Sequence, residues 1–278
     1  MMAVSDSLQE KYRNLKDILR EMDSVLIGFS GGVDSALLLK VAHDVLGRRA
    51  LAITGNSATL ALSELEEAKR VVENIGASHV IVQADELECA DFVVNPPERC
   101  YHCKKTRFST FKKIQLERGL KWMADGTSAD DEGDWRPGIK AGIEMGIRSP
   151  LKEAGLTKSD IRKLSADLGL PTWDKPSMAC LASRVPYGEA ITEEKLHQIA
   201  EAEAYLQGLG FRQLRVRHHG DLARIEVPRE SMNEVLRQSD VIAGKLKEIG
   251  FYFVALDLSG FKSGSMNAVL NNALVDPQ

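Results

Sequence analysis

Six consecutive residues of the 278-residue chain have the types and the spacing to bind phosphate: Ser30-Gly31-Gly32-Val33-Asp34-Ser35. They lie between an apolar run of strand length and an apolar helical segment. The two glycines let the backbone turn its N–H groups inward, and the start of a helix adds the positive end of its dipole. Ser30 and Ser35 add hydroxyl donors, whereas Asp34 would repel phosphate, so we expect it to bind Mg²⁺ or to cap the helix. The lysine of the G-x-x-x-x-G-K-[ST] phosphate loop is absent.

The cysteines form a second group with chemical potential. Four cysteines are too few for a disulfide framework in a chain of this length. Cys100 and Cys103 form a C-x-x-C pair at the start of an expected helix, and Cys180 lies far along the chain. Three interpretations of these cysteines stay open. Cys100 and Cys103 could form a redox pair, the three cysteines could bind structural zinc with His218 or His219 as a fourth ligand, or they could bind an iron–sulfur cluster. Cys89 fits a buried thiol without a ligand.

Residues 214–227 alternate with period two around a turn at Gly220, which is typical of a β-hairpin. Apolar side chains point to one face, and Arg215 and Arg217 point to the other. Because a guanidinium fork matches phosphate and carboxylate, we interpret this face as a site for a phosphorylated, carboxylated substrate. A solvated face with ion pairs is the alternative.

The elements that must position these residues follow two patterns. As far as about residue 168, apolar strands alternate with amphipathic helices, which indicates a doubly wound parallel sheet in an α/β fold. Such sheets bind ligands beyond the carboxyl ends of their strands. We therefore expect Ser57, Gly126 and Thr127, which follow the second and the fourth strand, to line a ligand site, with ordinary loop residues as the alternative. The expected strands are 24–29, 50–54, 79–82 and 122–124, and the expected helices are 5–22, 36–46, 62–75, 103–118 and 157–168.

After about residue 186 the pattern changes to a small α+β unit. It comprises a helix at 193–208, the hairpin, a helical stretch at 230–249 and a strand at 251–256. The expected domains are 1–186 and 187–264, followed by a disordered tail at 265–278.

Composition excludes several classes of protein. With 44% hydrophobic and 27% charged residues the chain is globular rather than disordered or low in complexity. Its net charge of −4 disfavours nonspecific binding to nucleic acid or anionic membranes. No apolar run approaches the ~20 residues of a membrane span, and the first twenty residues are too polar for a signal peptide. We expect a cytoplasmic protein.

The hexapeptide at 30–35 resembles the PP-loop of the N-type ATP pyrophosphatases. Similar enzymes, such as GMP, NAD and asparagine synthetases and tRNA-thiolating enzymes, hold the β- and γ-phosphates of ATP in that loop. The resemblance implies that a substrate oxygen attacks the α-phosphate of MgATP, with pyrophosphate as the leaving group. Within that fold we expect Ser57, Gly126 and Thr127 to line the adenine and ribose pocket.

Four segments together resemble the LarE family of ATP-dependent sulfur transferases: SGGVDS at 30–35, RCYHC at 99–103, ACLASR at 179–184 and the Arg-x-Arg strand. The resemblance extends from Asp6 to about Gly264. That family makes the pyridinium nucleotide of the nickel-pincer cofactor of lactate racemase. The resemblance implies pyridinium-3,5-biscarboxylic acid mononucleotide as the substrate, whose carboxylates become thiocarboxylates. It further implies that Cys180 attacks the adenylate, that Arg215 and Arg217 bind the substrate phosphate, and that Glu203 is a catalytic residue of the site.

The presence of Cys100 and Cys103 makes the chain similar to the three-cysteine form of that family. This form implies a 4Fe–4S cluster on Cys100, Cys103 and Cys180 that delivers hydrosulfide, with sulfide or another sulfur donor as the source. In that case Cys180 keeps its sulfur instead of sacrificing it. Similar enzymes are homo-oligomers, and a hexamer is one expected size. The alternatives are a tRNA-thiolating PP-loop enzyme, which the net charge disfavours, and a zinc-stabilised nucleotide-binding protein without sulfur chemistry.

Overall fold

The computed structural model describes residues 2–131, 137–176, 179–262, 264–267 and 270. The chain divides into two compact units. The first unit comprises Met1–Ser57, Leu62–Glu86 and Cys100–Met178, and the second comprises Ala58–Ala61, Leu87–Arg99 and Ala179–Gln278. Two short segments from the N-terminal half therefore pack with the C-terminal part of the chain. None of the helices in the described ranges is long and apolar enough to cross a membrane.

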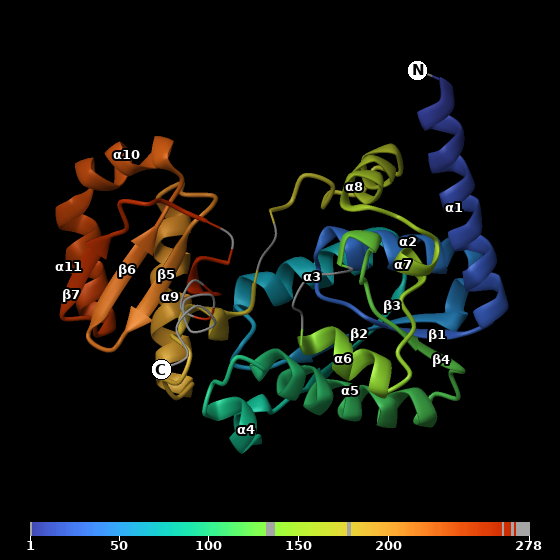
Figure 1. Cartoon of the computed structure of the whole chain (residues 1–278), viewed down its shortest axis with the longest axis horizontal. Coiled ribbons are helices and arrows are strands. Elements are labelled where there is room, and N and C mark those ends of the chain that lie inside the picture. The colour runs from blue at the N-terminus through green and yellow to red at the C-terminus, as the bar shows by residue number, and fades with distance from the viewer. Residues whose placement is uncertain (1, 132–136, 177–178, 263, 268–269, 271–278) are drawn as a thin grey trace. The chain divides into compact units, whose positions relative to one another are not determined.

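The first unit is built on a four-stranded parallel sheet with the strand order β3-β2-β1-β4 (Figure 1). The chain places β2 and β3 on one side of β1 and then returns to place β4 on the other side. The sheet is therefore doubly wound, and its topological switch point lies between β1 and β4, where such folds bind ligands. The predicted α/β fold class is confirmed. The strands are β1 (Val25–Gly28), β2 (Ala50–Asn56), β3 (Ser78–Gln83) and β4 (Trp122–Ala124).

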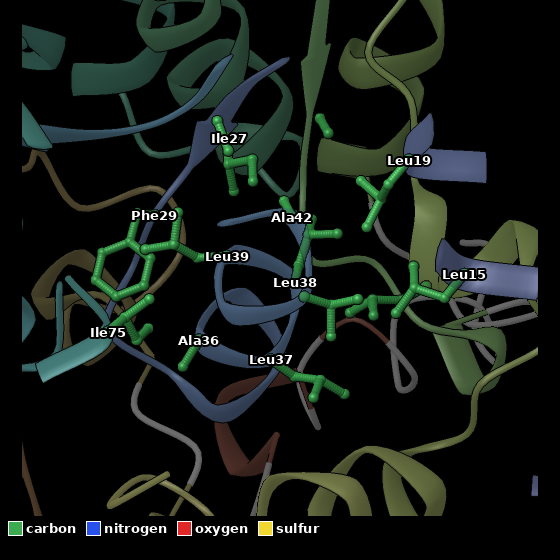
Figure 2. Close-up of a cluster of buried hydrophobic side chains, with 14 of the residues drawn as sticks. Leu15, Leu19, Ile27, Phe29, Ala36, Leu37, Leu38, Leu39, Ala42 and Ile75 are labelled. Carbon is green, nitrogen blue, oxygen red and sulfur yellow. The ribbon is translucent and has the colours of Figure 1, made fainter. Parts of the chain in front are cut away.

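Alternate side chains of the central strands enter two different apolar layers. Val25 and Ile27 pack with the helices α1, α2, α3, α7 and α8, in the cluster that Figure 2 shows in close-up. Leu26 and Ile53 face the opposite layer, which contains Phe108 from α5. A strand with both faces covered reads as a continuous apolar run, which explains the pattern in the sequence. The helices of the first unit are α1 (Met2–Met22), α2 (Val33–Leu46), α3 (Leu62–Ile75), α5 (Arg99–Glu117), α6 (Pro137–Glu144), α7 (Pro150–Glu153) and α8 (Lys158–Asp167).

The second unit contains a three-stranded sheet with the order β5-β6-β7. β5 (Arg215–His219) and β6 (Leu222–Glu226) form the expected antiparallel hairpin, and β7 (Phe253–Leu256) joins β6 in parallel. The apolar face of the hairpin packs into its own core, as the alternation predicts. The small α+β architecture of this part is confirmed. Its helices are α4 (Ala90–Val93), α9 (Glu193–Gly208), α10 (Met232–Arg237) and α11 (Ser239–Ile249).

Three element predictions were wrong in detail. The single helix expected at 230–249 is broken at Gln238, whose backbone leaves the helical conformation and whose amide donates to Glu234. The helix expected to begin at residue 103 begins at Arg99. The last strand begins at Phe253 instead of Phe251, because Phe251 is buried in the core after the turn at Gly250. Of the expected tail, 265–267 form a short 3-10 helix, while 268–269 and 271–278 lie outside the described residues.

Candidate functional site

The phosphate loop, residues 30–35, connects β1 to α2 and is closed by its own hydroxyl groups. The Oγ atoms of Ser30 and Ser35 lie 3.1 Å apart, and Ser35 Oγ also donates to the carbonyl of Gly32 at 3.2 Å. Gly31 has a φ of 73°, and a Cβ there would lie 3.2 Å from the Cβ of Ala68, so glycine is required. The N-cap of α2 is Gly32, without a side-chain cap, so the first amides of α2 remain for an anion.

Asp34 lies inside the first turn of α2, so the prediction that it caps this helix is wrong. Its Oδ2 accepts a hydrogen bond of 2.6 Å from Lys158 Nζ. Its Oδ1 is buried and has no hydrogen-bond partner among the described residues. A carboxylate oxygen without a partner beside a phosphate loop is the donor that Mg²⁺ prefers, so the residues present fit this ion.

Two lysines from outside the loop reach it, and sequence reasoning missed both. Lys158 follows Thr157, which forms a capping box with Asp160 at the start of α8. Lys175 Nζ donates to the carbonyl of Gly31 at 3.3 Å and pairs with two glutamates of α3, Glu64 and Glu67. The capping box predicts where α8 begins, but only the tertiary structure shows that this helix start faces the loop.

The segment after β4 packs directly on the phosphate loop, at the switch point of the sheet. A Cβ added to Gly126 would lie 3.0 Å from the backbone nitrogen of Ser35 and 3.2 Å from the Cβ of Asp34. The amide of Thr127 donates to Asp125 Oδ1 at 3.1 Å, which orders this strand end. Ser57, which follows β2, is buried. The structure thus brings Gly126 to the loop, while the adenine and ribose contacts of Ser57, Gly126 and Thr127 stay a prediction.

Arg215 and Arg217 lie on β5 and are each only 5% exposed, so their face of the hairpin is not a solvated one. Arg217 pairs with Glu226 at 2.7 Å and donates to the carbonyl of Ser183 at 3.1 Å. Arg215 stacks on the ring of Phe261, with 5.2 Å between its guanidinium carbon and the ring centroid. Arg217 is therefore held by an ion pair and a hydrogen bond, and Arg215 by packing on an aromatic ring.

Arg215 belongs to a cluster of four arginines and three carboxylates, so the cluster contains one more positive than negative group. Burial, reinforced by neighbouring Arg184, lowers the pKa of Arg215 to about 10, although Glu203 opposes the shift. An anion bound here would relieve this repulsion, because opposite charges favour the ionised form of the guanidinium. The connected charged groups of this cluster are Arg184, Arg215, Arg217 and Arg224 on one side and Glu203, Glu226 and Asp257 on the other.

Cys180 is exposed and precedes a short 3-10 helix, Leu181–Arg184. Arg184, which is 1% exposed, forms a bidentate pair with Glu203 at 2.9 and 2.8 Å. The same guanidinium donates to the carbonyl of Cys180 at 2.9 Å. Glu203 is therefore connected to the cysteine segment through Arg184, and its catalytic role stays a prediction.

None of the cysteines is in a disulfide. Cys100 is exposed, and Cys103 Sγ lies 3.9 Å from Glu86 Oε1. Cys100 and Cys103 belong to the first unit and Cys180 to the second. In the part of the chain that the structure describes, no group of three or more His, Cys, Asp or Glu side chains could hold a metal ion. Cys89 is half-buried, not buried as expected.

The two histidines considered as a fourth zinc ligand are engaged elsewhere. His218 Nε2 lies 2.9 Å from Gln198 Oε1, and His219 Nε2 accepts from Arg224 at 3.1 Å. Desolvation lowers the pKa of both imidazoles.

The doubly wound sheet carries a glycine- and serine-rich loop after its first strand and an acidic residue in the helical turn that follows. Residues 7–93 match the family described as NAD synthase. Together these features identify the class of the protein as a PP-loop ATP pyrophosphatase. The chain is 46% identical, over 95% of its length and 99% of the relative's, to an uncharacterised protein of Synechocystis sp.. It is 39% identical, over 96% of its length and 97% of the relative's, to the pyridinium-3,5-bisthiocarboxylic acid mononucleotide synthase of Lactiplantibacillus plantarum. A GMP synthase of Coxiella burnetii is 25% identical over 57% of this chain and 34% of its own. The chain belongs to the family of the L. plantarum synthase, the LarE family, and is an ATP-dependent sulfurtransferase, as its motifs predicted.

Proposed function

We propose that this enzyme adenylates a ring carboxylate of pyridinium-3,5-biscarboxylic acid mononucleotide and then replaces a carboxylate oxygen with sulfur. The name of the L. plantarum relative supports this substrate. The observation that carries the proposal is one hydrogen-bonded network in the second unit. Arg184 donates to the carbonyl of Cys180, and Arg217 donates to the carbonyl of Ser183. A candidate sulfur carrier and a candidate phosphate ligand are thus held by the same short segment.

The adenylation step uses the phosphate loop. The amides at the start of α2, the hydroxyls of Ser30 and Ser35, and Lys158 and Lys175 bind the β- and γ-phosphates of ATP. The substrate carboxylate oxygen attacks the α-phosphorus, and the bond between that phosphorus and the pyrophosphate oxygen breaks. Mg²⁺, when bound by Asp34, neutralises phosphate charge.

The nucleotide phosphate of the substrate binds to Arg215 and Arg217. The cluster has one more positive than negative group, which favours an anion, and the two guanidinium groups are already ordered by Phe261 and Glu226. Little side-chain entropy is then lost on binding.

In the second step, a sulfur nucleophile attacks the acyl adenylate. If the Cys180 thiolate attacks the acyl carbon, the bond to AMP breaks and a thioester forms. Release of the thiocarboxylate then requires loss of the Cys180 Cα proton and cleavage of the Cβ–S bond, which leaves dehydroalanine.

We favour the three-cysteine route over this sacrifice. Cys100 and Cys103 lie one turn apart at the start of α5, and Cys180 is exposed. The donor chemistry of three cysteines suits a cluster, although the described side chains do not form a metal-binding group. A 4Fe–4S cluster on the three thiolates, when bound, supplies hydrosulfide drawn from sulfide or another sulfur donor, so that Cys180 keeps its sulfur.

The test measures pyrophosphate release from MgATP and the biscarboxylated mononucleotide, with thiocarboxylate detected by mass spectrometry. A pyridinium mononucleotide without ring carboxylates is the control and should release none. Pyrophosphate release that depends on tRNA, with binding that persists at physiological salt, would replace the proposal with tRNA thiolation.

A metal assay decides the sulfur route. Protein purified without oxygen should contain about four irons with matching sulfide per chain, and Cys100→Ala should lose them. Zinc, or no metal after anaerobic reconstitution, would return Cys180 to the role of a sacrificed donor. Light scattering of the same sample tests the predicted homo-oligomer, a hexamer being one size.

A further inference from the structure

We infer that Arg184 and Glu203 form a positioning pair that holds the backbone of Cys180 in register with the strand carrying Arg215 and Arg217. Glu203 then acts through Arg184 and does not touch the substrate. The inference rests on the proposed function for the roles of Cys180 and the two strand arginines. It assigns to Arg184 a role that the sequence motifs did not indicate, and it changes the expected role of Glu203.

The pair is deeply buried and has good geometry. Arg184 is 1% exposed and Glu203 is 4% exposed. Nε and Nη2 of Arg184 donate to Oε1 and Oε2 of Glu203 at 2.9 and 2.8 Å, which is a parallel, bidentate arrangement. A buried ion pair contributes little net stability over apolar residues of the same volume, because both charges lose their hydration. The pair therefore acts mainly by fixing the positions of the groups that it contacts.

The remaining nitrogen of Arg184 holds the cysteine segment. Nη1 donates to the carbonyls of Ala179 and Cys180 and to Ser183 Oγ. The carbonyl of Cys180 also accepts from the amide of Ser183 at 3.0 Å. The main-chain carbonyl of Cys180 is therefore held by one guanidinium, while the residue itself is exposed.

The carboxylate of Glu203 holds the strand β5. Its Oε1 accepts a hydrogen bond of 2.9 Å from the amide of Val216, the residue between Arg215 and Arg217 on β5. One ion pair thus connects the segment of the candidate nucleophile to the strand of the candidate phosphate ligands. A displacement of the reacting groups by about 1 Å can cost about a hundredfold in rate, so such a connection matters for sulfur transfer.

Both oxygens of Glu203 accept from groups of the protein, and one of them accepts twice. A general base needs an oxygen within hydrogen-bond reach of the proton that it removes. The arrangement instead favours orientation of Arg184 and Val216.

The experiment compares Arg184→Gln, Arg184→Lys, Glu203→Gln and the double variant Arg184→Gln/Glu203→Gln. The readout is the ratio of thiocarboxylate formed to pyrophosphate released. We expect Arg184→Gln to keep pyrophosphate release within about threefold while the ratio falls at least about tenfold. Arg184→Lys should recover part of the loss. The double variant should be no worse than Arg184→Gln, because the two residues act as one unit.

The matched control is Gln198→Leu on the same helix, α9, which removes partly buried hydrogen bonds to His218 and to the carbonyl of Ile249. It should leave the ratio unchanged. Hydrogen exchange of peptides covering 179–185 should accelerate in the Arg184 and Glu203 variants and not in the control. If Arg184→Gln does not fold, Arg184→Lys and Glu203→Gln give the same test.

Two outcomes would overturn the inference. One is an equal loss of pyrophosphate release and of sulfur transfer in Arg184→Gln, which would indicate a general structural role. The other is loss of sulfur transfer in Glu203→Gln with exchange of 179–185 unchanged, which would place Glu203 in direct contact with the reaction. If the unaltered enzyme releases no pyrophosphate, the proposed function fails, whereas the exchange comparison still decides whether the pair orders the Cys180 segment.

Discussion

The phosphate loop and the arginine cluster are two candidate anion sites that are built by opposite means. The loop collects backbone amides, two hydroxyls and the end of a helix within six consecutive residues. The cluster collects ionised side chains from β5, β6, α9 and the segment after Cys180. Peptide dipoles need no counter-ion, whereas buried guanidinium groups must be paired with carboxylates.

This difference has consequences for substitution. The loop depends on close backbone approach, so a single added carbon can disturb it. The cluster depends on a balance of charges, so its members are coupled to one another. The following changes separate the two sites, from the largest expected effect to the smallest.

The largest effect is expected for Asp34→Ala in the loop. Removal of the candidate Mg²⁺ ligand should reduce pyrophosphate release by about a thousandfold, because the phosphate charge loses its metal clamp. Steady-state pyrophosphate assays measure this loss. Asp44→Ala, which removes an exposed pair with Lys40 on the same helix, should have almost no effect. Bound iron should be the same as in the unaltered protein, and its loss in Asp34→Ala would contradict this interpretation of the site.

In the cluster, Arg215→Ala should raise the KM for the mononucleotide about 30- to 100-fold and change the KM for ATP little. A charge-assisted hydrogen bond contributes about 1.5–3 kcal/mol, and the positive excess disappears with the side chain. Initial-rate kinetics with each substrate varied in turn give both constants. The exposed Arg212→Ala is the matched control. An equal rise in both constants would contradict the separation of the two sites.

Gly126→Ala tests the close approach of β4 to the loop. The added Cβ would meet backbone at 3.0 Å, so Ser35 and Asp34 must shift, and the KM for ATP should rise about tenfold. Gly244→Ala, on an open face of α11, should leave kinetics unchanged and stabilise the protein by about 0.5–1 kcal/mol. An unchanged KM for ATP in Gly126→Ala would show that the phosphate loop can shift to accommodate the added Cβ without loss of ATP binding.

The smallest effect concerns pH. Desolvation lowers the pKa of His79 in the first unit and of His218 and His219 in the second. The unfolded chain therefore binds protons below a pH of about 6.5 that the folded chain does not, and stability falls as the pH falls. The Tm should be lower at pH 5.5 than at pH 7.5. This difference in Tm should be smaller in His218→Gln, because one of the three histidines is removed. His197→Gln, at a 70% exposed side chain, should keep the full difference.

Many elements of both units could be predicted from local patterns. Apolar runs of strand length, glycines after helices and the period of the hairpin indicated most elements within a few residues. The phosphate loop was recognisable because its glycines, hydroxyls and helix start are neighbours in the chain. The break at Gln238 gave no signal, because no glycine or proline marks it.

The contacts between distant residues were decided by the tertiary structure alone. Lys158 and Lys175 reach the loop because of how α8 and the segment after it pack on α2 and α3. Residues 58–61 and 87–99 join the second unit although they lie within the N-terminal half. Arg184 and Glu203 are 19 positions apart, and nothing in the sequence indicated that their side chains pair. Periodicity and backbone chemistry are properties of neighbouring residues, whereas the burial and pairing of a charge depend on which segments the folded core brings together.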